Sequence, residues 1–222
     1  MLDLLRKTVT QVIFTVYGAI VVFPMVWLGY TSFKTTEELF ADAWSLPEIW
    51  SLANFIEAWN EAQIGDFFWN SIFVTVSTLI LQLFLGSMAS YSLAKYQFRG
   101  SNLIYYAFLA GLMFPIFLGL VPLFFLMKSL HLLNSHLGLI LVYAAFGLPF
   151  TIFVLTAFFR TIPTTIMEAG IMDGCSHFKL YWSVMLPLAK PGIVTVGIFT
   201  FISIWNEYIL ALILLSSSHL RT

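Results

Sequence analysis

Residues 67–94 read FFWNSIFVTVSTLILQLFLGSMASYSLA, and none of these 28 side chains carries a charge. Asp66 precedes the stretch and Lys95 follows it. A helix needs about 20 mostly apolar residues to cross the hydrocarbon core of a membrane. The stretch therefore predicts a membrane-spanning helix, which we place at about residues 68–93.

Four more uncharged or nearly uncharged stretches lie on either side of this one. The whole chain is 60% hydrophobic and only 9% charged, with a mean hydropathy of +0.92. Soluble chains carry roughly 25% charged residues, because a folded surface must be solvated. The sequence therefore predicts an all-α, polytopic helical membrane protein with five spans, at about residues 9–32, 68–93, 102–127, 137–159 and 190–215.

Composition also excludes several classes of function. The 10 basic and 11 acidic residues give a net charge of −1. The sequence contains no cluster of basic residues that could neutralise a nucleic-acid backbone. The single cysteine, Cys175, excludes an internal disulfide framework, and no His/Cys group has metal-ligand spacing. We therefore expect no nucleic-acid partner, no bound metal and no cofactor.

The positions of the basic residues predict the orientation, since short loops rich in Lys and Arg stay in the cytoplasm. With a cytoplasmic amino terminus, seven of the ten basic residues lie inside and three outside. The inside set is Arg6, Lys7, Lys95, Arg99, Arg160, Lys179 and Lys190. This orientation places residues 34–66 outside as the main outer loop and residues 160–187 in the cytoplasm.

The outer loop 34–66 contains seven of the eleven acidic residues. Within it, Leu52, Phe55 and Trp59 recur at helical spacing after Ser51, a residue type that often caps helices. We expect a short amphipathic helix along the membrane surface. Its acidic face either contacts an outer partner or is simply solvated.

Four proline residues lie inside three of the apolar stretches. Each proline removes a backbone hydrogen bond and tends to kink its helix, so neighbouring groups must satisfy the freed carbonyl. The four residues are Pro24, Pro115, Pro122 and Pro149. Such kinks are typical of helices that open and close, and they also occur in static bundles.

The fifth span contains Glu207, the one acidic residue expected at membrane depth, within the run Trp205, Asn206, Glu207, Tyr208. Sixteen residues beyond Pro191, it would lie about 24 Å along a continuous helix. A buried carboxylate is costly, so it must face protein or a cavity. It either lines the path of a solute or makes a hydrogen bond that holds two helices together.

The loop 160–187 is far longer than a connection between two spans requires. Pro163 suits the start of a helix with Thr164–Met172 as its body, and Gly174 suits a left-handed terminator. A second helix is expected from about residue 176 to 186, ended by Pro187. Ala169 and Gly170 leave the first helix nearly bare, so it is either a docking surface or a helix resting on lipid headgroups.

The order Glu168-Ala169-Gly170, three residues, Gly174, nine residues, Val184-x-Leu186-Pro187 resembles the loop of binding-protein-dependent ABC importer permeases. That family usually has alanine in place of Gly170 and isoleucine in place of Val184. The resemblance covers most of the chain and is strongest to the carbohydrate-uptake, maltose-type branch. Its further motifs here are Asn54-Phe55-x-Glu57-Ala58-Trp59, Asn70-Ser71, Tyr96-x-Phe98-Arg99-Gly100, Phe159-Arg160-x-Ile162-Pro163 and Trp205-Asn206-Glu207-Tyr208.

The resemblance implies a type I ABC importer permease fold in a prokaryotic cytoplasmic (inner) membrane. It implies a second homologous permease subunit, two ATP-binding ABC subunits that use ATP and Mg, and an extracytoplasmic solute-binding protein as partners. The loop would dock on the ATPase through Glu168, Ala169, Gly170, Asp173, Gly174, Leu186 and Pro187. Consistent with this, the sequence has no Gly-x4-Gly-Lys-Ser/Thr phosphate loop, so the chain itself is not expected to be an enzyme.

Members of that family usually have a sixth span, and we expect this sequence to lack it. The leading hypothesis is a permease for a sugar or sugar derivative. A stand-alone secondary transporter or channel, an ABC permease for a non-sugar solute and an integral-membrane enzyme are the alternatives. The sequence shows neither a repeat with paired intramembrane charges nor a hydrolase or zinc motif, which disfavours the first and the last of these.

Overall fold

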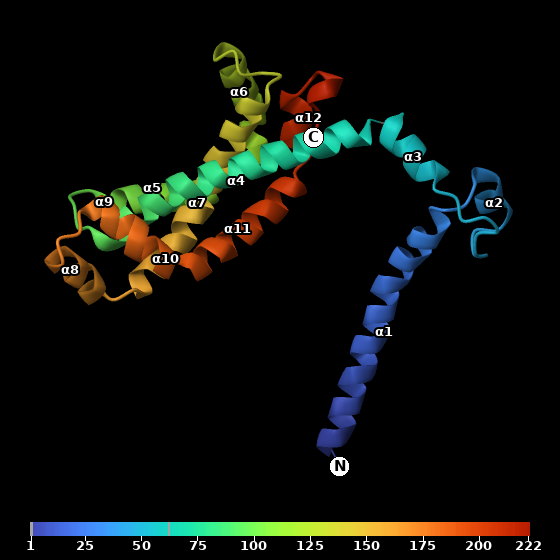
Figure 1. Ribbon diagram of the computed structural model, residues 1–222, viewed down its shortest axis with the longest axis horizontal. Helices are drawn as coiled ribbons and strands as arrows, with labels where there is room; N and C mark the ends of the chain where they lie inside the picture. The colour runs from blue at the N-terminus through green and yellow to red at the C-terminus, as the bar shows by residue number, and fades with distance from the viewer. Residues whose placement is uncertain (1, 62) are drawn as a thin grey trace. The chain divides into compact units, whose positions relative to one another are not determined.

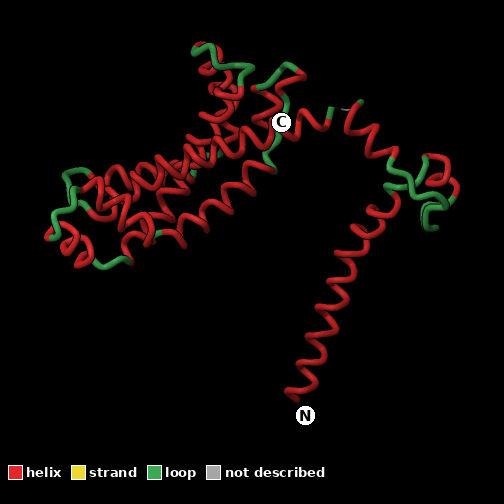
Figure 2. Tube along the Cα trace, in the orientation of Figure 1, coloured by secondary structure: helices red, strands yellow, loops and turns green. Residues whose placement is uncertain are grey.

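Figure 1 shows the computed structural model, which describes residues 2–61 and 63–222. Helices account for most of this part of the chain, and it contains no β-strand (Figure 2). The all-α prediction is confirmed. The chain divides into two compact units, Met1–Gly65 and Asp66–Thr222.

The first unit contains one long helix and two short ones. These are α1 (Leu2–Thr31), α2 (Thr36–Ala41) and α3 (Ala53–Asn60). The predicted span 9–32 lies within α1 except for residue 32, and α1 begins seven residues earlier than predicted. The short helix expected after Ser51 is α3, and the Ser51 hydroxyl accepts a hydrogen bond from the Ala53 amide at 3.1 Å.

Lys34 organises the loop of the first unit. Its side chain is only 2% exposed, and its Nζ donates to the Asp42 carbonyl at 2.7 Å and to the Ser45 hydroxyl at 2.8 Å. The side-chain amide nitrogen of Asn54 donates to the carbonyls of Ser32 and Lys34 at 2.9 and 2.7 Å. Because these bonds join the end of α1 to both halves of the loop, the loop is a folded structure.

The second unit is a bundle of helices. Its elements are α4 (Ile64–Lys95, which begins at the boundary), α5 (Ser101–Leu112), α6 (Ile116–Ser129), α7 (His136–Thr161), α8 (Thr164–Met172), α9 (His177–Leu180), the π-helical turn η1 (Tyr181–Met185), α10 (Leu186–Leu188), α11 (Lys190–Trp205), α12 (Ile209–Leu214) and the short 3-10 turn η2 (Ser218–Leu220). In Figure 1, α8 and α9 lie at one end of this unit, and α6 and α12 lie at the other.

Within the described residues, three helices are long and apolar enough to cross a membrane. They are Leu4–Thr31, Ile64–Lys95 and His136–Thr161, and the number rises to five if each of two bent helix pairs counts as one span. These three include nearly all of the predicted spans 9–32, 68–93 and 137–159. The chain therefore has the helices of an integral membrane protein.

The predicted span 102–127 differs from the structure, which has two helices there. α5 and α6 meet at a bend of 102°, separated by residues 113–115. Pro115 precedes α6, lacks an amide hydrogen and disfavours helical geometry at Phe114. Pro24, Pro122 and Pro149 instead lie inside continuous helices.

The predicted span 190–215 is also interrupted. α11 ends at Trp205 and α12 begins at Ile209, so Glu207 lies in the break between them. The expectation that Glu207 lies part-way along a continuous helix is therefore wrong. The Asn206 side chain donates to the Ile202 carbonyl at 2.7 Å, which satisfies one carbonyl at the end of α11.

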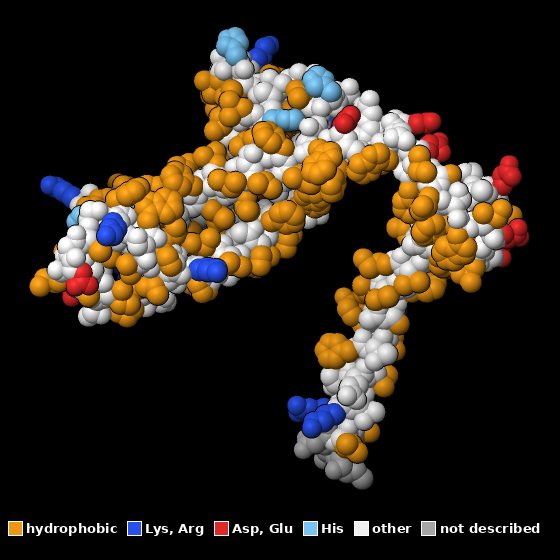
Figure 3. Space-filling view, viewed as in Figure 1, with side chains coloured by type: hydrophobic (Ala, Val, Ile, Leu, Met, Phe, Trp, Pro, Cys, Tyr) orange, Lys and Arg blue, Asp and Glu red, His pale blue; other side chains and the backbone are white. Residues whose placement is uncertain are grey.

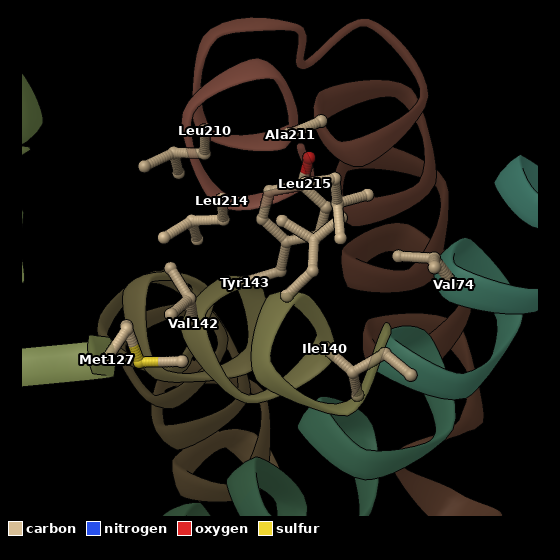
Figure 4. Close-up of a cluster of buried hydrophobic side chains, with 10 residues drawn as sticks. Val74, Met127, Ile140, Val142, Tyr143, Leu210, Ala211, Leu214 and Leu215 are labelled. Carbon is tan, nitrogen blue, oxygen red and sulfur yellow. The ribbon is translucent and has the colours of Figure 1, made fainter. Parts of the chain in front are cut away.

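Two hydrophobic clusters hold the second unit together. The cluster in Figure 4 joins α6, α7 and α12 with Val74 of α4 at its edge, and its labelled members include Met127, Val142, Tyr143, Leu210 and Leu214. The other cluster lies beside α8 and α9 and contains Tyr91, Leu155, Phe159, Leu180 and Met185. Hydrophobic side chains also cover much of the visible outer surface, as a lipid-facing protein requires (Figure 3).

Candidate functional site

The loop between α7 and α11 is built from two short helices joined by a tight turn. Its first helix, α8, covers Thr164–Met172, as the sequence predicts, and Pro163 precedes it with a φ of −58°. Ser176 caps the second helix, α9, because its hydroxyl accepts a hydrogen bond from the Lys179 amide at 3.3 Å. Both helix starts are therefore fixed by local sequence.

Gly174 forms the turn between α8 and α9. Its φ is +80°, in the left-handed region that residues with a Cβ avoid. Its amide donates to the Ile171 carbonyl at 3.0 Å, and the Cys175 amide donates to the Gly170 carbonyl at 3.0 Å. These bonds satisfy carbonyls at the end of α8, as in a glycine-terminated helix.

The tip of this loop is exposed and mixed in character. Met172 is 86% exposed and Phe178 is 67% exposed, which is unusual for large apolar side chains unless they meet a partner or lipid. Glu168 and Asp173 are exposed beside them. Their carboxylates make no hydrogen bond within the described chain, so both are available to an external group.

Gly170 does not contribute to a bare outer surface, contrary to the sequence-based expectation. A Cβ at this position would lie 2.5 Å from Cδ1 of Leu180, so the small residue faces inward against α9. Leu180 is fully buried. Glu168 and Ala169 belong to the exposed face of α8, whereas Gly170 lets the two short helices pack closely.

The second helix of the loop also differs from the prediction of one helix ended by Pro187. α9 is followed by η1, in which the Leu186 amide donates to the Tyr181 carbonyl, five residues back. Pro187 then lies in the first turn of α10, where an amide hydrogen is not needed. Leu186 and Pro187 are therefore part of the connection to α11 and not of the exposed tip.

Glu207 lies in the break between α11 and α12, and its side chain forms hydrogen bonds with the start of α12. Its Oε1 accepts from the Leu210 amide at 2.8 Å, and its Oε2 accepts from the Ala211 amide at 3.3 Å. Tyr143 of α7 donates its hydroxyl to Oε2 at 2.6 Å. The carboxylate therefore caps the start of α12, where anions are favoured, and bonds that helix to α7.

The same carboxylate lies in the wall of a cavity of about 340 Å³. The other lining residues are Gln82, Ile116, Tyr143, Phe146, Gly147, Phe150, Phe199, Thr200, Ser203, Ile204 and Leu210. A concave, mostly apolar site with a few convergent polar groups is typical of small-molecule sites. Trp205, Asn206 and Tyr208 are exposed in the structure and do not line it.

Gln82 is a functional candidate that sequence reasoning missed. It is 1% exposed, and its Nε2 donates to the hydroxyls of Thr151 and Thr200 at 2.7 and 3.1 Å. One side chain thereby joins α4, α7 and α11. A lone glutamine within 28 uncharged residues is the signal that could have identified it.

Asn134 was likewise not identified from the sequence. Its Oδ1 accepts from the amides of Ser216 and Ser217 at 3.1 and 2.9 Å, and its Nδ2 donates to the Ser217 hydroxyl at 2.7 Å. Its φ is +54°, in the left-handed region that asparagine tolerates. The side chains of Asn70 and His136 form hydrogen bonds with the carbonyls of residues 219–221. The segment after α12 is therefore held by α4, by the start of α7 and by the connection between α6 and α7.

Comparison with known proteins adds the family to this geometry. Residues 82–222 match the family described as binding-protein-dependent transport system inner membrane component. The permease protein NgcG of a diacetylchitobiose uptake system in Streptomyces coelicolor is 46% identical over 202 residues, 91% of this chain and 67% of that protein. The trehalose transport system permease protein SugB of Mycobacterium tuberculosis is 34% identical, over 93% of this chain and 75% of that one.

A solved structure supports the fold. It is a crystal structure of a bacterial ABC transporter involved in the import of the acidic polysaccharide alginate. The match has a TM-score of 0.88 at 24% identity and covers 98% of this chain and 77% of the other. The chain therefore shares the fold of a chain in that transporter.

Proposed function

The chain belongs to the binding-protein-dependent transport system inner membrane component family, and on that premise we propose that it is a permease subunit of an ATP-driven sugar importer. It pairs with a second homologous permease and two ATP-binding subunits, and it receives solute from an extracytoplasmic solute-binding protein. The complex lies in a prokaryotic cytoplasmic membrane, with the amino terminus of this chain inside. ATP and Mg are used by the partner ATPases.

The observation that carries the proposal is the exposed tip formed by α8, Gly174 and α9. An exposed apolar side chain at Met172 with free carboxylates at Glu168 and Asp173 suits a protein partner better than water. The hydrogen-bonded turn at Gly174 and the packing of Gly170 against Leu180 join the two helices into one unit. Such a unit can transmit the closing of an ATPase dimer to the spans on either side.

The sugar assignment is supported by the relatives. NgcG belongs to a diacetylchitobiose uptake system and SugB to a trehalose transport system. The cavity beside Glu207 is lined by aromatic side chains and by a few polar groups, which suits a polyhydroxylated ring. We place the solute path along this cavity, with Trp205, Asn206, Glu207 and Tyr208 at the helix break.

Docking is tested by purifying the tagged chain from membranes and identifying its partners by mass spectrometry. Gly174→Val forces a β-branched residue into left-handed geometry, at a cost of about 1–2 kcal/mol, and we expect the ATPase to be lost. Gly174→Asn is the matched control, because asparagine tolerates this geometry. Native chain recovered without an ATPase would instead favour a stand-alone transporter.

The substrate class is tested separately in proteoliposomes that contain the native complex and its binding protein. Uptake of radiolabelled diacetylchitobiose and trehalose is compared with uptake of an amino acid. ATP-dependent uptake of either sugar supports the proposal. If only the amino acid were taken up, the assignment as an ABC permease would stand and the assignment of a sugar substrate would be refuted.

A further inference from the structure

The loop that contains α8 and α9 is joined covalently to α7 and α11, whereas α4 has no covalent link to it. The structure nevertheless connects α4 to both short helices. Tyr91, near the end of α4, is only 5% exposed, and Tyr96 follows one residue after the helix. Their hydroxyls are 3.1 Å apart.

The two tyrosines extend a line of polar contacts across the loop. The Tyr96 hydroxyl is 3.0 Å from Nδ1 of His177, which begins α9. The Tyr91 hydroxyl donates to Sδ of Met167 in α8 at 3.8 Å. One order of donors and acceptors is consistent with all three contacts: His177 donates to Tyr96, Tyr96 donates to Tyr91, and Tyr91 donates to Met167.

Further contacts at the same level support this line. The Tyr181 hydroxyl of η1 is 2.7 Å from the Ser87 hydroxyl of α4, and both residues are buried. The Tyr91 ring lies 5.2 Å from the Tyr181 ring and 5.7 Å from the Phe159 ring, between centroids. The Lys95 ammonium donates to the Ile162 carbonyl at the end of α7. α4 therefore contacts α7 at the start of the loop and η1 near its end.

From this geometry we infer that Tyr91 and Tyr96 are positioning residues that make α4 move with the α8–α9 loop. The inference rests on the proposed docking role of that loop. Because the tyrosines lie behind the exposed tip, they act on the transmission of movement and not on binding of the ATPase. Removing their hydroxyls leaves the rings in place and cuts the line between α9, α4 and α8.

The test uses the full complex with Tyr91→Phe and Tyr96→Phe combined. Tyr106→Phe is the matched control, since Tyr106 is 64% exposed on the neighbouring helix α5 and its hydroxyl makes no hydrogen bond in the described chain. We expect the double variant to retain the ATPase on purification. Sugar transported per ATP hydrolysed should fall at least about fivefold, because one lost hydrogen bond of typical strength has about that effect and the double variant loses three contacts. It should remain unchanged in the control.

A spectroscopic measurement separates transmission from stability. Spin labels at Ser92 of α4 and Thr164 of α8, both exposed, report the distance between the two helices in a Cys175→Ser background. In the otherwise native complex the distance should stay constant when ATP binds, and in the double variant it should change. Unchanged transport per ATP in the double variant, or loss of the ATPase from it, would overturn the inference. Failure of the native chain to recover any ATPase would refute the proposed function itself.

Discussion

Replacing Glu207 with alanine tests how the break between α11 and α12 is stabilised. The substitution removes three hydrogen bonds, one from Tyr143 and two from the Leu210 and Ala211 amides. A bond between membrane helices contributes about 0.6 kcal/mol on average and about 1.7 kcal/mol at most. Loss of a helix cap costs about 1 kcal/mol.

Together these effects predict a destabilisation of about 2 kcal/mol, with Tyr143 left without its acceptor. For a chain of this size that corresponds to a fall of about 4–8 °C in the unfolding midpoint. Glu207→Gln retains an oxygen that can accept from the α12 amides, so its fall should be about half as large. The midpoint is measured on the purified complex in detergent by size-exclusion chromatography after heating.

Transport by the same variants distinguishes the two roles of Glu207. If the carboxylate is only a cap, transport should follow the amount of folded complex in both variants. If it also contacts solute, Glu207→Gln should lower transport more than it lowers stability. A Glu207→Ala complex with a native midpoint would refute the reasoning, because the three hydrogen bonds would then contribute nothing to stability.

Two further predictions concern tightly packed positions. A Cβ at Gly138 would lie 2.1 Å from the Leu132 carbonyl oxygen, so Gly138→Ala should reduce the yield of folded protein severalfold. Gly18→Ala is the control and should not reduce the yield, because a Cβ at Gly18 would have no atom within 4 Å. Fluorescence-detected size-exclusion chromatography of solubilised membranes measures the yield of both variants. Asn134→Ala should free residues 216–217 and increase their amide hydrogen exchange at least tenfold while α7 stays protected. Equal protection in native and variant protein would show that Asn134 does not fix this segment.

Much of the loop 160–187 could be predicted from sequence because its signals are local. Pro163, Gly174 and Ser176 act on backbone geometry within a few residues, and the structure has α8, a left-handed turn and α9 at those positions. The π-helical turn at Tyr181–Met185 could not be predicted in this way. It inserts one extra residue per turn and depends on the fit of Tyr181 between Ser87 and Tyr91.

The helix break at Glu207 depends equally on distant partners. A run of apolar residues around a single carboxylate favours a continuous helix with a costly buried charge. In the structure the charge is stabilised by the amides of the next helix and by Tyr143, which lies 64 residues earlier in the chain. Only knowledge of the packing of α7 against α12 could have shown that interrupting the helix is favourable.

The sequence by itself therefore determined the membrane class, the three long apolar helices α1, α4 and α7, and the first helix and turn of the exposed loop. Hydrophobic length and the conformational limits of proline and glycine act locally, so they can be recognised in a linear sequence. Tertiary structure decided which faces meet. Gly170 turns toward Leu180, Gln82 joins three helices, and Tyr96 reaches His177, because each pairing requires residues that only the folded chain brings within a few ångströms of one another.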